Sequence, residues 1–359
     1  MTGTVRALVA RGADLAVEKV RLGAPAANEV RVRIRAAGVC HSDLSMINGT
    51  LAPPYPLVLG HEAAGEVIEV GVGVTRVRGG EHVVLNWSPA CRRCWFCARG
   101  ESWLCVMGGA PAAPRGTTAD GDPLHVTLGL GALAEEVVVP ENAVVAIPED
   151  VPWEQAALLG CAVLTGFGAV RNTAAVASGD SVAVIGLGGV GLSVVMAARR
   201  AGADPVIAVD VSDSKRELAL TAGATDFLVA DDALTRAIRE RTGGRGVDHA
   251  IECVGRSGTI RTAWRSARRG GQVIVVGMGG KDDLVTLSAL DIFHSARTLR
   301  SSVYGSSDPE REVPELARAV LDGSLDLRPL VTHRITLDGA SDAFERMARG
   351  EGGRSVVLI

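Results

Sequence analysis

The sequence of 359 residues lacks an excess of charge of one sign, because 37 basic residues stand against 41 acidic ones. The net charge of −4 is spread along the chain and gives no basic surface for nucleic acid or an anionic membrane. The densest basic run, at residues 261–269, is interpreted as a solvated helix face. We therefore expect neither nucleic acid nor a membrane as a partner.

Signals for export or membrane insertion are also missing. The N-terminal stretch MTGTVRALVARGADLAVEKV has polar and charged residues from its start and no apolar core of a signal peptide. No uncharged apolar run reaches the about 18 residues that a spanning helix needs. Internal repeats and low-complexity tracts are absent as well. The sequence therefore predicts a cytoplasmic protein.

Cysteine is scarce, yet four of the seven cysteines lie close together in PACRRCWFCARGESWLC. The spacing of Cys91, Cys94, Cys97 and Cys105 is Cys-x2-Cys-x2-Cys-x7-Cys. Such a cluster can form disulfides, hold an iron–sulfur cluster or bind a zinc ion through four thiolates. A reducing cytoplasm argues against disulfides, which leaves the two metal sites open.

What the chain does contain indicates a compact α/β protein of two domains. It has 47% hydrophobic residues, 44 glycines and 22% charged residues, and its length exceeds that of one ordinary domain. The first 150 residues carry short β-rich runs between glycines and prolines, which predicts a mostly antiparallel β domain. From about Ser181, buried-strand runs alternate with helical stretches, which predicts a doubly wound parallel sheet.

A glycine-rich turn at the start of this second region predicts a dinucleotide site. VAVIGLGGVGLS places Gly186, Gly188 and Gly191 in a Gly-x-Gly-x-x-Gly pattern, with Gly189 and Val190 inside it. The glycines permit a tight turn, close approach of a pyrophosphate, and close packing of strand and helix. The pyrophosphate is expected at the N-terminus of the helix.

An acidic residue ends the next predicted strand and bears on the choice of cofactor. Asp210, in VIAVD, can accept hydrogen bonds from the adenosine ribose and would repel a 2′-phosphate. NAD is therefore predicted rather than NADP. Lys215 is a further candidate at the ribose, with a solvated helix lysine as the alternative.

Three further residues form a possible second metal site. Cys40, His61 and Cys161 occur in GVCHSD, LGHEAAG and LLGCAVLTG. Each alone would be interpreted as a buried structural residue. Together, two thiolates and an imidazole make a catalytic zinc site with an open fourth position, which can polarise an alcohol for hydride loss.

These segments, in this order, resemble the zinc-dependent medium-chain alcohol dehydrogenase family over essentially the full length. The resemblance extends through GVCHSDL, GHEAAGEV, the cysteine cluster, LLGCAVLTGFGA, GLGGVGLS and the final RSVVLI. It implies a GroES-like catalytic domain at residues 1–162, to which 304–359 returns, and a Rossmann NAD-binding domain at 163–303. It also implies two zinc ions per chain, a structural one on the four clustered cysteines and a catalytic one on Cys40, His61 and Cys161.

The resemblance further implies roles for individual residues. Ser42 matches the hydroxyl that accepts the alcohol proton, Asp43 the carboxylate that orients His61, and Glu62 an acidic residue near the metal. The positions predicted to contact the cofactor outside the glycine turn are His41, Thr165 and Arg354. Some family members have a histidine five positions after the first zinc cysteine, where this chain has Ser45. The resemblance therefore implies no outer proton route beyond Ser42 for this chain.

The substrate is left between two possibilities. Trp87, Leu51 and Leu128 are candidates for the apolar wall of a primary-alcohol pocket, with ordinary core positions as the alternative. The segment PRGTTADGDPLHVTLGLGALAEE resembles the thiol-dependent formaldehyde dehydrogenase branch, which suggests S-(hydroxymethyl)mycothiol or a related thiol adduct as substrate. A non-catalytic zinc and nucleotide-binding protein is a third hypothesis, against which the full set of zinc ligands and Ser42 argues.

The resemblance finally predicts a homodimer. In the family, two nucleotide domains join edge to edge through the sixth strand, which ARTLRSSVYG would form here. The long loop at residues 111–127 favours the dimeric branch of the family over the tetrameric one.

Overall fold

The computed structural model describes residues 3–108 and 113–359, which form two compact units. Unit 1 spans Met1–Leu164 and Asp308–Ile359, and unit 2 spans Thr165–Ser307. The sequence predicted the domain borders at 162/163 and 303/304, a few residues before the borders of these units. The roles of the units as catalytic and NAD-binding domains stay a prediction. Residues 111 and 112 of the predicted loop lie outside the described part.

Unit 1 is built on two β-sheets, mostly antiparallel as the sequence predicts. The smaller sheet has the order β2-β1-β4-β7, from β1 (Gly3–Arg11), β2 (Asp14–Leu22), β4 (Leu57–Val58) and β7 (His125–Val126). The larger has the order β16-β17-β3-β5-β6-β9, with β8 also paired to β3. Its strands are β3 (Glu29–Gly38), β5 (Ala63–Val70), β6 (His82–Leu85), β8 (Glu136–Pro140), β9 (Val144–Ala146), β16 (Val331–Ile335) and β17 (Arg354–Leu358).

The core of unit 1 follows from the alternation of apolar residues along its strands. Val30, Val32 and Ile34 of β3 are fully buried at every second position, as expected when one face of a strand packs inward. The helices of this unit are α1 (His41–Ile47), α2 (Trp95–Ala98), α3 (Trp153–Leu158), α10 (Pro309–Leu321) and α11 (Ala340–Ala348). Because β17 pairs with β3, strands from both sides of unit 2 in the sequence lie side by side in the larger sheet.

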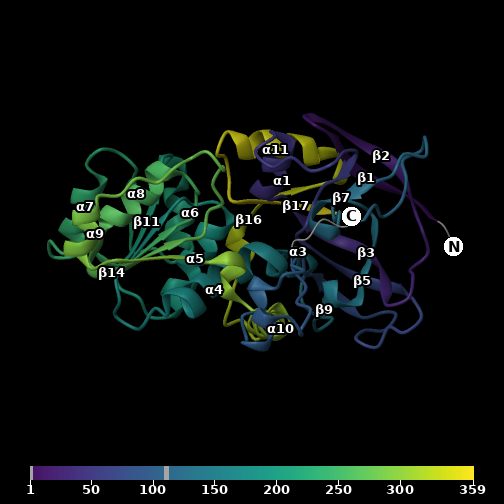
Figure 1. The fold of residues 1–359 in the computed structure, drawn as a ribbon, viewed down its shortest axis with the longest axis horizontal. Helices are drawn as coiled ribbons and strands as arrows, with labels where there is room; N and C mark the ends of the chain where they lie inside the picture. Colours follow the sequence, from purple (N-terminus) through teal and green to yellow (C-terminus); the bar gives the residue numbers. More distant parts are fainter. Residues whose placement is uncertain (1–2, 109–112) are drawn as a thin grey trace. The chain divides into compact units, whose positions relative to one another are not determined.

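Unit 2 contains the predicted doubly wound parallel sheet, in the order β12-β11-β10-β13-β14-β15. Its strands are β10 (Val182–Ile185), β11 (Val206–Asp210), β12 (Asp226–Val229), β13 (Val247–Glu252), β14 (Ala267–Val275) and β15 (Thr298–Ser301). Figure 1 shows helices around this sheet: α5 (Gly189–Arg200), α6 (Arg216–Thr221), α7 (Leu234–Arg241), α8 (Ser257–Ser266) and α9 (Ala289–Ser295). The strand order reverses between β10 and β13, where such sheets bind nucleotides.

The sixth strand is shorter than the sequence suggests. β15 ends at Ser301, and Val303–Ser306 forms a 3₁₀ turn. Tyr304, Gly305 and Ser306 have φ values of 51°, 71° and 49°, so the backbone cannot continue as an extended strand. The run LRSSVYG thus combines a strand with a left-handed turn.

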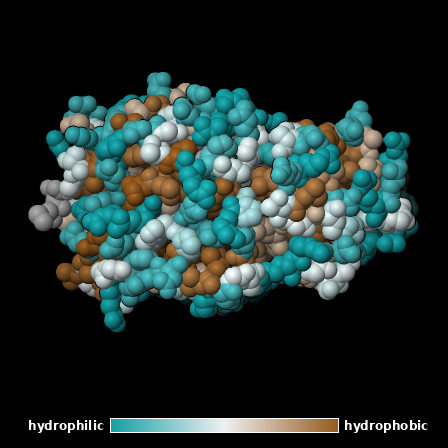
Figure 2. Space-filling view, turned by 180° about the vertical axis from the view of Figure 1, so that it is seen from behind, coloured by the Kyte–Doolittle hydropathy of each residue, from teal (hydrophilic) through white to brown (hydrophobic). Residues whose placement is uncertain are grey.

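One helical stretch, Trp153–Ala174, is long and apolar enough to cross a membrane by length and composition. It includes α3, the π-helical turn Leu159–Val163 and α4 (Leu164–Gly168). Since 78% of its most apolar window is buried in the protein, it has the character of a core helix. The face in Figure 2 is largely hydrophilic, with hydrophobic residues in smaller groups between.

Candidate functional site

Cys40, His61 and Cys161 lie together in unit 1 although the sequence separates them widely. Cys40 immediately precedes α1, His61 lies between β4 and β5, and Cys161 lies in the π-helical turn. All three are buried, and their ligand atoms lie within 4.8 Å of one another. The Cys161 sulfur is 3.4 Å from Nε2 of His61. The structure therefore brings together the donor set of a zinc site with an open position.

Two glycines allow the chain to place these ligands. Gly60, directly before His61, has a φ of +96°, and a Cβ there would lie 2.4 Å from the backbone nitrogen of Leu133. Gly160, directly before Cys161, packs so closely on β6 that a Cβ would lie 2.4 Å from a carbonyl oxygen of that strand. A side chain at either position would displace the neighbouring ligand.

Asp43 orients the imidazole of His61. Its carboxylate is fully buried, lies 3.3 Å from Nδ1 of His61 and accepts the backbone N–H of Gly60 at 2.9 Å. With Nδ1 facing a carboxylate, Nε2 is left to face the two sulfurs. A ligand histidine held in this way by a carboxylate is typical of zinc sites, so the residues present fit the metal.

Arg354 and Glu62 form a buried ion pair beside Cys40. Nη2 of Arg354 lies 3.2 Å from the Glu62 carboxylate and 3.6 Å from the Cys40 sulfur, and Nη1 donates to the carbonyl of Val39 at 2.8 Å. Glu62 also accepts the backbone N–H of Ala162 at 3.3 Å. The sequence did not predict this contact, because β17 meets Cys40 only through the folded sheet.

Burial and charge shift the pKa values of several groups at the site, Glu62 and Cys40 among them. Burial raises the pKa of Glu62 to about 7, although the guanidinium of Arg354 favours its ionised form. The pKa of Cys40 is lowered, first by a hydrogen bond from Cys161 and also by the positive charge of Arg354. A thiol that ionises readily is suited to bind a metal, because the thiolate is the ligand.

Two serines on α1 differ in their surroundings. Ser42 is partly buried, and its Oγ lies 4.0 Å from the sulfur of Cys40. Ser45 is buried and donates its hydroxyl to the carbonyl of His41 at 3.1 Å. The Ser45 hydroxyl is thus bound within its own helix.

The four clustered cysteines form a second compact donor set. The sulfurs of Cys91, Cys94, Cys97 and Cys105 lie within 4.8 Å of one another, and all four cysteines are free thiols. The backbone N–H of Cys91 lies 3.2 Å from the sulfur of Cys105, and that of Cys94 lies 3.3 Å from the sulfur of Cys91. Amide groups that point at sulfurs stabilise thiolates, so this set fits a structural zinc closed by four cysteines.

Arg92 connects the segment of the four clustered cysteines to the start of α10. This residue lies between the first two cysteines with a φ of 59°, and its guanidinium makes two hydrogen bonds of 2.7 and 2.6 Å to Asp308. Glu310 lies 3.1 Å from the same guanidinium. Paired Arg–carboxylate bonds of this kind fix geometry better than single contacts do.

The glycine turn in unit 2 is tightly packed at its first and third glycines and open at its second. Gly186 follows β10 with a φ of +92°, and a Cβ on Gly191 would lie 1.8 Å from the carbonyl oxygen of Gly186. By contrast, Gly188 is exposed at the start of α5, and a Cβ on it would meet no atom within 4 Å. The backbone there is open to a ligand at a helix N-terminus, so an anion can approach it closely.

Asp210 lies at the end of β11, beside this turn. Its carboxylate accepts the backbone N–H of Leu187 at 2.9 Å and that of Ser212 at 3.0 Å. Lys215 is buried nearby, and burial lowers its pKa although the charge of Asp210 acts in the opposite direction. Both predicted ribose residues therefore lie at the carboxyl end of β11, Asp210 as its last residue and Lys215 in the turn that follows.

The remaining predicted cofactor residues are spread over both units. Thr165 is buried at the start of unit 2, in α4, and Gly189 and Val190 begin α5. His41 is exposed as the first residue of α1, and Arg354 lies at the zinc-ligand cluster in unit 1.

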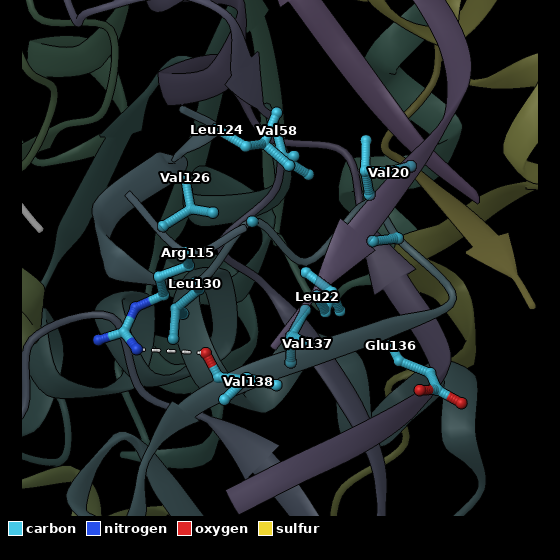
Figure 3. A pocket seen from close by; sticks show the side chains of 13 residues that line it. Val20, Leu22, Val58, Arg115, Leu124, Val126, Leu130, Glu136, Val137 and Val138 are labelled. Carbon is cyan, nitrogen blue, oxygen red and sulfur yellow. Dashed lines mark hydrogen bonds between the residues drawn. The ribbon is translucent and has the colours of Figure 1, made fainter. Parts of the chain in front are cut away.

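The predicted wall residues Trp87, Leu51 and Leu128 are partly buried and pack against the core of unit 1. A separate small cavity of this unit lies near Arg115, which donates a hydrogen bond of 3.3 Å to the carbonyl of Val138 (Figure 3). Its lining is mainly aliphatic and includes none of the predicted site residues. It is therefore separate from the predicted site residues.

The sequence matches two known domain families. Residues 26–149 match the alcohol dehydrogenase GroES-like domain, and residues 189–322 match the zinc-binding dehydrogenase family. The chain is 37% identical over 360 residues to an S-(hydroxymethyl)glutathione dehydrogenase of Escherichia coli O1:K1 / APEC, with 97% of each chain covered.

Solved structures resemble the whole chain as well. An alcohol dehydrogenase zinc-binding domain protein from Burkholderia ambifaria has a TM-score of 0.93 and 35% identity, with 100% of both chains covered. Benzyl alcohol dehydrogenase from Acinetobacter calcoaceticus has a TM-score of 0.91 and 30% identity, with 99% of both chains covered.

Proposed function

Because this chain belongs to the zinc-dependent medium-chain alcohol dehydrogenase family, we propose that it interconverts a primary alcohol and an aldehyde with NAD. One alcohol and one NAD⁺ give one aldehyde, one NADH and one proton. The alcohol carbon loses a hydride, with both electrons, to the nicotinamide, and the hydroxyl loses the proton. The observation that carries the proposal is the convergence of Cys40, His61 and Cys161 within 4.8 Å, next to Ser42.

Different residues of the chain take the proton, orient the ligand histidine and balance the charge at this site. When bound, the catalytic zinc supplies a Lewis acid that lowers the pKa of the alcohol hydroxyl. Ser42 accepts the hydroxyl proton and passes it towards solvent. Asp43 keeps the ring of His61 in the orientation that a ligand requires, and Arg354 balances the negative charge of Cys40 and Glu62.

NAD is proposed as the cofactor because of Asp210. Its carboxylate is positioned by two backbone N–H groups at the end of β11, where the adenosine ribose is expected. A fixed negative charge there favours ribose hydroxyls and repels a 2′-phosphate.

A thiol adduct of formaldehyde is the second candidate substrate. The chain's similarity to an S-(hydroxymethyl)glutathione dehydrogenase over 97% of both chains favours it. The chemistry would be the same, since the hydroxymethyl group of the adduct is a primary alcohol that becomes an S-formyl thioester when its carbon loses a hydride and its hydroxyl loses a proton. S-(hydroxymethyl)mycothiol is the member of this class that the resemblance to the thiol-dependent formaldehyde dehydrogenase branch implies.

Absorbance of NADH with a panel of alcohols tests both candidates. The panel comprises aliphatic primary alcohols, benzyl alcohol, and formaldehyde with and without added glutathione or mycothiol. Activity with simple alcohols alone supports the first candidate, and formaldehyde oxidation that requires the thiol supports the second. Absence of NADH formation with every member, in protein that holds two zinc ions, would overturn the proposed function.

We further propose that the enzyme is a cytoplasmic homodimer joined through β15. This strand lies at the end of the sheet, and all four of its residues are exposed. Apolar side chains are exposed on it and on the preceding helix, with 45% of Leu299 and 79% of Phe293 accessible. An open strand edge beside apolar residues can pair with a second copy about a two-fold axis.

A further inference from the structure

A buried carboxylate that the predicted site does not include lies at the carboxyl end of β13. Glu252 is the last residue of this strand and is fully buried. In the sheet it lies in register with Ile185 of β10 on one side and Val275 of β14 on the other. The strand order reverses between β10 and β13, so Glu252 lies beside the reversal point, and β10 separates its strand from β11, which carries Asp210.

Hydrogen bonds from the following loop and from the first turn of α8 surround this carboxylate. It accepts the backbone N–H of Val254 at 2.9 Å, the backbone N–H of Gly255 at 2.8 Å and the hydroxyl of Thr259 at 2.6 Å. Burial raises the pKa of Glu252, whereas these hydrogen bonds favour its ionised form. A buried carboxylate is costly unless it is bonded in this way, and here its bonds define the path of one loop, residues 253–256.

The loop at residues 253–256 packs closely against Gly186 of the nucleotide turn and against Gly277 after β14. A Cβ on Gly186 would lie 2.4 Å from Cγ2 of Val254, so the valine side chain rests on the first glycine of the nucleotide turn. Gly255 has a φ of +82°, and a Cβ there would lie 2.5 Å from the backbone of Met278. In turn, a Cβ on Gly277 would lie 2.1 Å from the nitrogen of Gly255. A shift of the loop would therefore disturb both neighbours.

We propose that Glu252 is a positioning residue for the nicotinamide half of the cofactor, acting through the loop at residues 253–256. A doubly wound sheet consists of two mononucleotide-binding halves, and Asp210 on β11 marks the half that takes the adenosine. The loop after β13 begins the other half. This inference rests on the proposed binding of NAD.

Binding measurements with two ligands separate this role from a general structural one. Glu252→Gln keeps the shape of the side chain but removes its charge, and Thr259→Val removes one of its donors. We expect Glu252→Gln to weaken NAD about tenfold, the scale of a lost charge-assisted hydrogen bond, and Thr259→Val to weaken it less. AMP, which occupies the adenosine half alone, should bind both variants as tightly as wild type. Calorimetry gives both dissociation constants.

Glu240→Gln on α7 serves as the matched control, because Glu240 is exposed on the surface. Unchanged NAD affinity in folded Glu252→Gln would overturn the inference, and so would equal weakening of NAD and AMP. If Glu252→Gln does not fold, the NAD and AMP constants of Thr259→Val decide by the same criteria. Failure of the wild type to bind NAD would instead overturn the proposed function.

Discussion

Nδ1 of His61 lies 3.3 Å from the buried carboxylate of Asp43, eighteen positions earlier in the chain. Asp43→Asn removes the negative charge that holds the ring, so Nε2 should be presented less well to a metal. Loss of such a partner typically lowers metal affinity about 10- to 100-fold. We expect faster loss of one zinc to a chelator and lower turnover, measured together. Asp342→Asn, at an exposed position on α11, should leave both unchanged.

The two donor sets should hold two zinc ions with separable roles. Cys161→Ser should reduce bound zinc from two ions to one and abolish turnover while the protein stays folded. Cys97→Ser should also lose one zinc but mainly lower the melting temperature, because a structural zinc contributes directly to folding. Metal analysis and thermal unfolding of both variants check this. A single zinc in freshly purified, active wild type would contradict it.

Ser42 should be needed for removal of the alcohol proton. Ser42→Ala removes the hydroxyl beside Cys40 and should lower kcat by roughly 10² or more, the usual scale for a positioned proton-transfer group. Ser42→Thr retains the oxygen and should keep most of the activity. Steady-state kinetics decide the matter, and full activity of the alanine variant would mean that the proton leaves directly to water.

Asp210 should determine the preference between NAD and NADP. Asp210→Gly removes the repulsive carboxylate and frees the two backbone N–H groups that it now binds, those of Leu187 and Ser212. We expect kcat/KM to fall with NAD and to rise with NADP, because freed amides can donate to a phosphate oxygen. A wild type that already prefers NADP would show that the interpretation of this strand is wrong.

Association through β15 should depend on its exposed apolar residues. Leu299→Glu places a charge on the open edge and should shift the protein from dimer to monomer in light scattering. Leu220→Glu on α6, which starts from a similarly exposed leucine, should not. A wild type with the mass of one chain would refute the proposed dimer, and a tetramer would overturn only the choice of branch.

The sequence predicted most directly those features that depend on neighbours in the chain, whereas the grouping of Cys40, His61 and Cys161 was predicted from their residue types and from the family resemblance. The glycine turn between β10 and α5 and the four clustered cysteines are local patterns, and the structure shows both as compact sites. The contact of Arg354 with Cys40 was not predicted, because it depends on how β17 enters the sheet beside β3. Nor was the end of β15 at Ser301, since nothing in the letters SSVYG requires left-handed angles at Tyr304.

The position of Arg354 has a consequence for how the protein is made. Unit 2 is continuous in the chain, whereas unit 1 is interrupted by it and resumes only at Asp308. On a ribosome, the segment that contains Cys40, His61 and Cys161 is therefore complete long before β17 is synthesised. The β3 strand can pair on this side only after β17 has been made, and closing so long a loop is slow. The buried guanidinium of Arg354 thus reaches Cys40 and Glu62 only after β17 has been synthesised and paired.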